Sequence, residues 1–246
     1  MAGRLDDVRR FYELLALLEE KLGGTRLLEE ADGKMDWPRR GVYFFFEHGE
    51  DRSTSGNGLR VVRIGTHALR VGAKSTLWKR LRQHRGTMSG AYAGGGNHRG
   101  SIFRGHVGYA LMRTNEWSVE VTSEWSQGST ADRELRMREF RLEQRVSAHI
   151  RMMPFLWLRV DDSPRPESSR GLIERNAIAL LSNYPTVGSD SQSTERIDPP
   201  SANWLGRHAK SEKVSRSGLW NSNHVDAGYE SEFLLVLEQT ILGLRA

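Results

Sequence analysis

The sequence predicts an α+β fold in which three short strands alternate with helices along the chain. Two apolar runs rich in aromatic and β-branched residues, at 41–47 and 59–66, are typical of buried strands. A third such run lies at 154–160. Apolar residues at three- and four-residue spacing precede and follow these runs and predict helices. The chain of 246 residues is long enough to bury a sizeable core.

The first predicted helix spans residues 5–22 and packs against the domain. Gly23-Gly24 ends it. The polar, glycine-rich segment 48–58 is expected to be the loop of a hairpin that joins the first two strands. The apolar positions of the helix recur every three or four residues: Leu5, Val8, Phe11, Leu14, Leu15, Leu18 and Leu22.

A second helix is predicted at 75–84, directly after the hairpin. Leu77 and Leu81 lie one turn apart on one face of this helix. Arg80 and His84 lie one turn apart on a neighbouring face. The pattern therefore presents a cation and an imidazole side by side.

The rest of the chain is less regular. The glycine-rich segment 87–101 predicts a loop, and 102–112 fits either a strand or a short helix. Further helices are expected at 132–151, 168–182 and 230–243, with a Ser- and Pro-rich linker at 185–202.

Basic residues are concentrated in a segment that contains no acidic residue. The net charge is +5, and no Asp or Glu occurs between Asp51 and Glu116. A surface of one sign attracts phosphates, which favours a nucleic-acid partner over a basic face without a ligand. The segment contains four histidines and these basic residues: Arg52, Arg60, Arg63, Arg70, Lys74, Lys79, Arg80, Arg82, Arg85, Arg99, Arg104 and Arg113.

Composition excludes several classes of site. Cysteine is absent, which excludes disulfides, thiolate metal sites and a cysteine nucleophile. This absence fits a cytoplasmic protein. No apolar run approaches the length of a membrane span, and residues 1–7 lack the apolar run of a signal peptide.

Four chemistry-bearing segments follow one another in a familiar order. Gly41-Val42-Tyr43 opens the first strand, and Arg63-Ile64-Gly65 closes the second. The helix with Arg80 and His84 follows, and Glu174 lies in a later helix. This order resembles that of the GIY-YIG nuclease superfamily.

The resemblance covers roughly residues 38–185. It implies a small antiparallel three-stranded sheet flanked by helices, which agrees with the order of elements predicted above. The Arg-x-x-x-His spacing in the helix at 75–84 is similar to that of the restriction-endonuclease branch of the superfamily.

The resemblance implies metal-assisted hydrolysis of a phosphodiester. Glu174 would hold one Mg²⁺ or Mn²⁺ through a hard carboxylate oxygen, with waters and substrate completing the coordination. Arg80 would stabilise the negative charge of the transition state, because a guanidinium is always charged and can bind two oxygens at once.

The remaining catalytic roles fall to Tyr43, His84, Arg63 and His67. Tyr43 would position or deprotonate the attacking water, aided by nearby cations that lower the pKa of its hydroxyl. His84 would orient the water or assist proton transfer. Arg63 stands where the family has its second tyrosine, and His67 is the nearest substitute for that residue.

Further side chains are candidates for binding. Three of them lie in the glycine-rich stretch 94–104, where bare backbone amides and basic side chains could bind a phosphate chain. A flexible surface loop is an equally good interpretation of this stretch. The polar segment that contains Asn221, Asn223 and His224 is interpreted as a loop held by its own amides. Recognition of bases by these side chains is the alternative. The expected nucleic-acid contacts are Lys74, Lys79, Arg82, His98, Arg99 and Arg104, and Asn183 is the candidate for the family's asparagine.

These observations together predict a metal-dependent endonuclease that acts on nucleic acid, in particular double-stranded DNA, and is compatible with a role in restriction or defence. Cutting both strands with one site per chain favours a homodimer. The alternatives are a catalytically inactive module that keeps the fold and binds nucleic acid, and a basic scaffold for proteins. The expected organisation is an N-terminal helical segment (1–37), a core with an insertion at about 87–130 (38–185) and a C-terminal extension (186–246).

Overall fold

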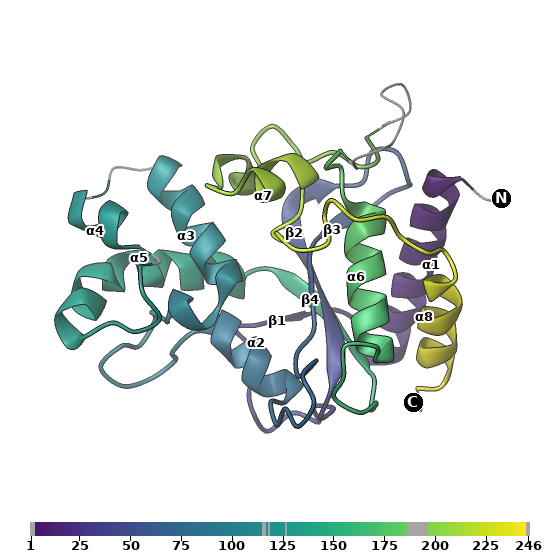
Figure 1. Ribbon diagram of the computed structural model, residues 1–246, viewed down its shortest axis with the longest axis horizontal. Helices are drawn as coiled ribbons and strands as arrows, with labels where there is room; N and C mark the ends of the chain where they lie inside the picture. Colours follow the sequence, from purple (N-terminus) through teal and green to yellow (C-terminus); the bar gives the residue numbers. More distant parts are fainter. Residues whose placement is uncertain (1–2, 115–116, 118, 126, 186–195, 245–246) are drawn as a thin grey trace.

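The computed structural model is an α+β protein built around a four-stranded antiparallel sheet (Figure 1). It describes residues 3–114, 117, 119–125, 127–185 and 196–244. The strand order is β1-β4-β2-β3. The strands are β1 (Arg26–Leu27), β2 (Gly41–Asp51), β3 (Leu59–Gly65) and β4 (Pro154–Arg159).

The three predicted strands are confirmed, and β1 extends the predicted three-stranded sheet. β1 pairs with β4 through Arg26, which lies opposite Phe155, and Leu27, which lies opposite Pro154. Two residues are too few to show an alternating pattern in the sequence, so nothing in the chain predicted this strand.

Strand β2 is buried on both of its faces. Val42 and Phe44 point into one core cluster, whereas Tyr43 and Phe45 point into the other. Since successive side chains of a strand point in opposite directions, the unbroken apolar run places bulky groups in both layers. The sheet therefore forms the middle layer of the molecule.

One face of the sheet is covered by α1 (Arg4–Leu22), α6 (Ser169–Leu181) and α8 (Phe233–Leu242) (Figure 1). Helix α1 confirms the first predicted helix. Helix α6 begins at Ser168, whose hydroxyl accepts a hydrogen bond from the backbone N–H of Gly171 at 3.2 Å. This cap fixes the start of the helix that carries Glu174.

The other face is covered by α2 (Leu77–Arg85), α3 (Ile102–Thr114) and α5 (Arg133–Arg151) (Figure 1). The segment for which either a strand or a helix was expected is the helix α3. The cap of α2 is Thr76, which accepts from the backbone N–H of Lys79 at 3.3 Å. Two short elements accompany these helices, the 3₁₀ turn η1 (His98–Gly100) and the helix α4 (Val119–Glu124).

The C-terminal segment packs into both cores. It contains the 3₁₀ turn η2 (Leu205–His208) and the helix α7 (Glu212–Ser217) before α8. Trp204 and Trp220 enter the core on the α2 side, where both indole N–H groups donate to Glu47 at 3.1 Å. The backbone N–H of Trp220 donates to the carbonyl of Val62 at 2.7 Å and so covers the outer edge of β3. This contact blunts an edge that would otherwise pair with another chain.

The predicted boundaries near residues 38 and 185 stay predictions. Most of the predicted linker, residues 186–195, lies outside the described residues. No helix in the described ranges combines the length and the apolar character that crossing a bilayer requires.

Candidate active site

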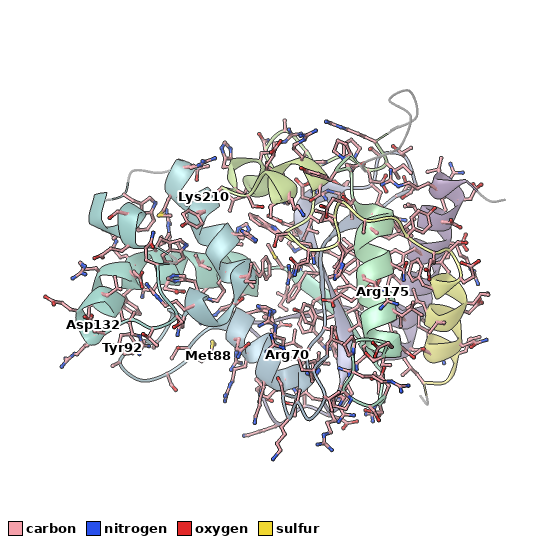
Figure 2. All side chains as sticks on the ribbon, viewed as in Figure 1. Arg70, Met88, Tyr92, Asp132, Arg175 and Lys210 are labelled. Atoms are coloured by element: carbon pink, nitrogen blue, oxygen red, sulfur yellow. The ribbon has the colours of Figure 1, made fainter. Side chains whose placement is uncertain are left out.

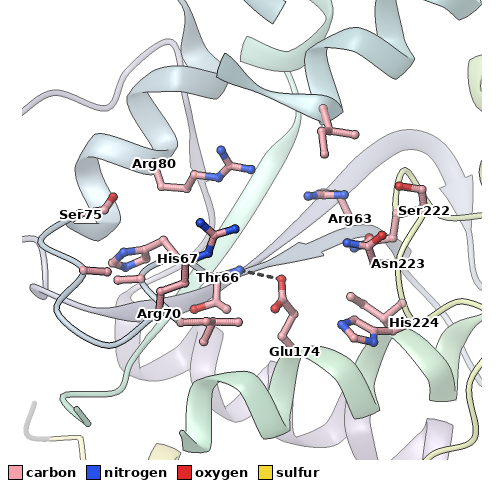
Figure 3. Close-up of a pocket in the computed structure, with 16 residues that line it drawn as sticks. Arg63, Thr66, His67, Arg70, Ser75, Arg80, Glu174, Ser222, Asn223 and His224 are labelled. Atoms are coloured by element: carbon pink, nitrogen blue, oxygen red, sulfur yellow. Dashed lines mark hydrogen bonds between the residues drawn. The ribbon is translucent and has the colours of Figure 1, made fainter. Parts of the chain in front are cut away.

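A cleft opens where α2, α6 and the end of β3 meet the C-terminal segment (Figure 3). Its volume is about 450 Å³, within the range of about 300–1,000 Å³ that is usual for ligand sites. Residues from four distant parts of the chain line it, including Arg63, His67, Arg80, Glu174 and Asn223. The structure thus brings together four of the six predicted catalytic residues.

The carboxylate of Glu174 lies at the floor of this cleft. One carboxylate oxygen accepts a hydrogen bond from the backbone N–H of Thr66 at 3.0 Å. Glu174 forms no ion pair with any residue in the described ranges. Burial raises the pKa of this carboxyl group, although Arg63, the Thr66 bond and Arg80 oppose the effect. The site therefore holds a hard oxygen donor that no side-chain cation already neutralises.

Three arginines point toward the space above Glu174 (Figure 3). Arg80 comes from α2 and Arg63 from β3. Arg70 lies on the connection between these elements, in the space between α2 and α6 (Figure 2). Since a guanidinium cannot lose its charge near neutral pH, these groups make the cleft attractive to an anion such as phosphate.

Two of the arginines are held in place by contacts outside the cleft. Arg80 donates to the side-chain oxygen of Gln83 at 3.0 Å and to the carbonyl of Gly100 at 3.3 Å. Arg63 donates to the carbonyl of Trp220 at 2.9 Å. All three acceptors are uncharged, so both guanidinium groups keep their full charge for a substrate.

A buried arginine that no sequence motif identified shapes the lip of the cleft. Arg170 is 0% exposed and pairs with Asp162. It also donates to the carbonyl of His67, whose neighbour Ala68 has a left-handed backbone with φ of 56°. A charge this deeply buried requires a counter-charge and several acceptors, and here they fix the connection from β3 to α2.

Tyr43 and His84 lie behind the cleft rather than in its lining. Both side chains are 0% exposed. The Tyr43 hydroxyl lies 2.8 Å from Nε2 of His84, and Nδ1 of His84 lies 2.8 Å from the Ser101 hydroxyl. A Cβ at Gly65 would collide with the Tyr43 hydroxyl, so only glycine leaves room for the ring end at this position.

His84 is held in its neutral form. Burial lowers its pKa well below the usual value, and the charges of Arg80 and Arg63 add to the effect. A neutral imidazole has one nitrogen that can accept a proton. The Tyr43–His84 hydrogen bond provides a path for a proton, but the lowered pKa makes His84 a weak base, so proton transfer by the pair stays a prediction.

His67 lines the cleft as a neutral side chain. Burial and the neighbouring charge of Arg170 lower its pKa to about 4. Its two ring nitrogens are buried, and within the described residues neither makes a hydrogen bond of good geometry, although the backbone of Ser75 lies near enough to raise the pKa. A group with this pKa is a weak base near neutral pH, so orientation of a water or phosphate suits it better than proton transfer.

Three residues of the insertion fill internal positions. Arg99 binds both carboxylate oxygens of Glu139, at 2.6 and 2.9 Å. Arg104 is 0% exposed and pairs with Glu143, which also lies 2.9 Å from Nδ1 of His98. The structure gives His98, Arg99 and Arg104 this internal role in place of the predicted contacts with nucleic acid.

The other predicted binding residues lie outside the cleft lining. Lys74, Lys79 and Arg82 are exposed on or beside α2, where a long substrate could reach them. Asn183 uses both ends of its amide on the backbone of Ile197, at 3.0 Å each. Asn183 therefore holds two segments of the chain together. It does not line the cleft, where the family's asparagine was expected.

The C-terminal segment supplies one wall of the cleft. The amide of Asn221 accepts from the backbone N–H of Ile64 at 3.1 Å and donates to its carbonyl at 2.9 Å. Asn221 thus continues the pairing along β3, as the favoured interpretation of a loop held by its amides predicted. Asn223 and His224, which follow it, are exposed and line the cleft.

The donors in the cleft fit a metal ion that the protein holds through a single carboxylate. No group of three or more His, Asp or Glu side chains in the described part of the chain could form a closed metal cage. Mg²⁺ does not need such a cage, because it commonly keeps several waters and takes the rest of its ligands from substrate phosphate. Glu174, without an ion-pair partner, is suited to this arrangement.

Comparison with known proteins adds one finding. A family model described as "GIY-YIG domain" matches residues 2–245. No significant match was found among curated proteins or among solved structures. The match extends over α1 and the C-terminal segment as well as the sheet and the cleft.

Proposed function

This chain belongs to the GIY-YIG domain family, a family of nucleases, and we propose from that premise that it is a Mg²⁺-dependent endonuclease that cuts DNA. The observation that carries the proposal is the cleft in which Glu174 faces Arg63, Arg70 and Arg80. Hydrolysis of a phosphodiester needs charge relief on the phosphate and an activated water. The arginines meet the first need, and the Glu174 carboxylate would hold the metal ion that serves the second.

Four residues of the cleft have a defined role in the proposed reaction. Glu174 would hold a Mg²⁺, which when bound supplies a water of lowered pKa and offsets phosphate charge. Arg80 and Arg63 bind the non-bridging oxygens of the phosphate and stabilise the charge that grows on them in the transition state. Thr66 orients the Glu174 carboxylate through its backbone N–H.

Tyr43 and His84 enter the proposal as a proton-accepting pair behind the cleft. The hydrogen bond of 2.8 Å to His84 supports a path for the Tyr43 proton, whereas the lowered pKa of the imidazole opposes the transfer. The complete burial of the hydroxyl opposes a direct contact with the attacking water. The Tyr43→Phe variant tests whether the pair accepts a proton during the reaction.

Double-stranded DNA is the proposed substrate. The support is the Arg80-x-x-x-His84 spacing, which resembles the restriction-endonuclease branch, and the exposed Lys74, Lys79 and Arg82 beside the cleft. Lysine and arginine outside the cleft would bind the backbone of a duplex that extends beyond the scissile phosphate.

The competing function is an inactive module that binds nucleic acid. Arg63 in place of a tyrosine and the burial of Tyr43 favour it. Both functions require salt-dependent binding to DNA, but only the endonuclease requires cleavage.

Cleavage of plasmid and single-stranded DNA with and without Mg²⁺ tests the proposal. We expect the wild-type protein to cut in Mg²⁺ and Glu174→Gln to cut at least about 100-fold more slowly while binding DNA with little change. Glu167→Gln, an exposed glutamate just before α6, is the matched control and should cut as the wild type does. Tight binding without cleavage in Mg²⁺ or Mn²⁺ would establish the inactive module instead.

A further inference from the structure

We propose that Asn223, together with Ile102, forms a subsite for a nucleobase next to the phosphate-binding part of the cleft. The subsite would contact the base of a nucleotide that flanks the scissile phosphate. This inference rests on the proposed function and adds to it a point of sequence preference.

The two sides of the cleft differ in chemistry. His67, Arg70 and Arg80 lie on one side, whereas Ser222, Asn223 and His224 lie on the other, with Arg63 beside them (Figure 3). A phosphate needs cations, and the three arginines provide them. A carboxamide and a hydroxyl add no charge to bind a phosphate, but they match the donors and acceptors on the edge of a base.

Ile102 adds an apolar surface to the same cleft. It is the first residue of α3, lines the cleft and is 60% exposed. An apolar side chain among arginines has no favourable contact with a phosphate. The flat face of a base is apolar enough to pack against it, and apolar side chains are used in this way in other nucleic-acid complexes.

The segment that carries Asn223 is held rigidly at the edge of β3. Trp220 and Asn221 bond to the backbone of Val62 and Ile64, and the hydroxyl of Ser182 donates to the carbonyl of Val225 at 2.6 Å. Both ends of the loop 222–224 are therefore anchored to the body of the protein. A rigid loop loses little conformational freedom when it binds a ligand.

The side chains on this anchored loop are unused by the protein itself. Within the residues that the structure describes, Asn223 makes no hydrogen bond, and it is exposed. His224 has a left-handed backbone with φ of 63°, which is uncommon for a residue other than glycine. Strain of this kind persists only where the surroundings enforce it, and it often marks a functional site. Anchoring, a strained backbone and a free amide together indicate a built recognition element.

Sequencing of cleavage products tests the subsite. A pool of duplex oligonucleotides with a randomised central segment is cut in Mg²⁺, and the ends are sequenced. We expect the wild type to prefer one base at a position near the cut. Asn223→Ala should reduce that preference about 10-fold or more while retaining most of the cleavage rate on the pool. Asn223→Asp keeps the acceptor and loses the donors, so it should shift the preference toward cytosine, whose N4 amino group donates.

Two control variants match the residues in chemistry and exposure. Asn57→Ala removes an exposed amide in the loop between β2 and β3. Leu235→Ala removes an apolar side chain on α8 that is 59% exposed, and it is compared with Ile102→Ala. The controls should leave the base preference unchanged, and Ile102→Ala should weaken it. Thermal melting of every variant shows that the fold is kept.

Several outcomes would overturn the inference. If the wild type, Asn223→Ala and Asn223→Asp show the same preference, Asn223 does not contact a base. The same conclusion follows if the wild type shows no preference. A rise in KM that is equal for all sequences assigns Asn223 to the sugar–phosphate backbone instead. If the wild type binds the pool without cutting it, the proposed endonuclease activity is wrong. The bound oligonucleotides are then sequenced, and a base preference that Asn223→Ala lacks would still support the subsite.

Discussion

At the scale of single residues, the central feature is a carboxylate and three arginines that share a space without pairing. Glu174 receives a backbone hydrogen bond, and Arg80 and Arg63 donate only to uncharged acceptors. Glu174 and these arginines line one cleft, yet no ion pair joins them within the described residues. Their separation keeps both the anion and the cations available, which is the arrangement that a metal ion and a phosphate between them would require.

The first prediction concerns Arg80. Arg80→Ala should lower kcat by about 100-fold or more with little change in stability, because its charge acts in the transition state and its side chain is only partly buried. Steady-state kinetics on a DNA substrate measure the effect. Arg82→Ala, an exposed arginine on the same helix, is the matched control and should change kcat little. Equal losses in both variants would mean that the helix contributes only general positive charge.

The second prediction concerns Tyr43. Tyr43→Phe removes the hydroxyl and keeps the ring, so unfolding should become easier by about 1–3 kcal/mol because His84 loses its partner in the core. If the pair accepts a proton during the reaction, kcat should fall by about 100-fold or more. We expect this fall, together with a flatter dependence of kcat on pH. Full activity with only a lower melting temperature would restrict the pair to packing.

At the scale of elements, the insertion between α2 and β4 is organised by a buried charge cluster. Arg104 is enclosed by the carboxylate of Glu143, the carbonyl of His84 and the hydroxyl of Ser147. The cluster joins the end of α2 to α3 and α5. Helix α2, which carries Arg80, is thereby positioned by residues that do not line the cleft.

The third prediction tests this cluster. Glu143→Gln should reduce the free energy of unfolding by about 3–5 kcal/mol, because Arg104 would remain buried without a counter-charge. Chemical denaturation measures it. Glu124→Gln breaks an exposed pair with Arg138 and should change stability little. Equal effects of the two substitutions would contradict the account of the cluster.

The same carboxylate predicts a dependence of stability on pH. Burial on its own raises the pKa of Glu143, but the hydrogen bond from His98 and the charge of Arg104 lower the pKa to about 2. Because the pKa in the folded state is lower than that in the unfolded state, the ionised group stabilises the fold above about pH 4.5. This stability is lost as the pH falls from about 4.5 to about 2. Acid titration of the melting temperature should show the loss in the wild type and a smaller loss in Glu143→Gln.

The elements also show what the sequence could and could not predict. The aromatic run 41–47 and the helix around Glu174 were predictable, because burial imposes a local apolar pattern. Part of the acid-free segment lies inside the protein and not on its surface, since Arg60, Arg99 and Arg104 form buried pairs with Glu50, Glu139 and Glu143. Apart from Glu50, these partners lie about 40 positions away, and spacing carries no signal for such contacts.

The candidate site was predictable to a similar extent. Glu174, Arg80 and Arg63 were identified from the order of short motifs and do share the cleft. Arg70 and the wall at 222–224 were not assigned to the site. Nothing local distinguishes Arg70 from its basic neighbours, and the wall depends on the pairing of Asn221 with β3 across a long stretch of chain.

At the scale of the whole molecule, the sheet separates two cores and the cleft opens at one end of it. The helices α1, α6 and α8 support Glu174 from one side, and α2, α3 and α5 support Arg80 from the other. The C-terminal segment covers the edge of β3 and supplies one wall of the cleft. The site is thus shared between both layers, so a relative shift of the layers would disassemble it.

The fourth prediction concerns assembly. Each chain carries one Glu174 and one Arg80, so cutting both strands of a duplex at one place requires two chains or two successive events. We expect a homodimer on DNA, seen by sedimentation of the Glu174→Gln variant with a duplex, and linear plasmid as an early product. Accumulation of nicked plasmid with a strictly monomeric complex would contradict the dimer and indicate a nicking enzyme.

A double-mutant cycle on Glu174 and Arg80 tests the central claim most directly. Single-turnover cleavage is measured for the wild type, Glu174→Gln, Arg80→Ala and the variant with both changes. If the two side chains act on one phosphate, the double variant should be hardly slower than the slower single variant, because residues that act as a unit lose their effect together. Losses that multiply would mean that Glu174 and Arg80 act independently, and the shared cleft would not be a single active site.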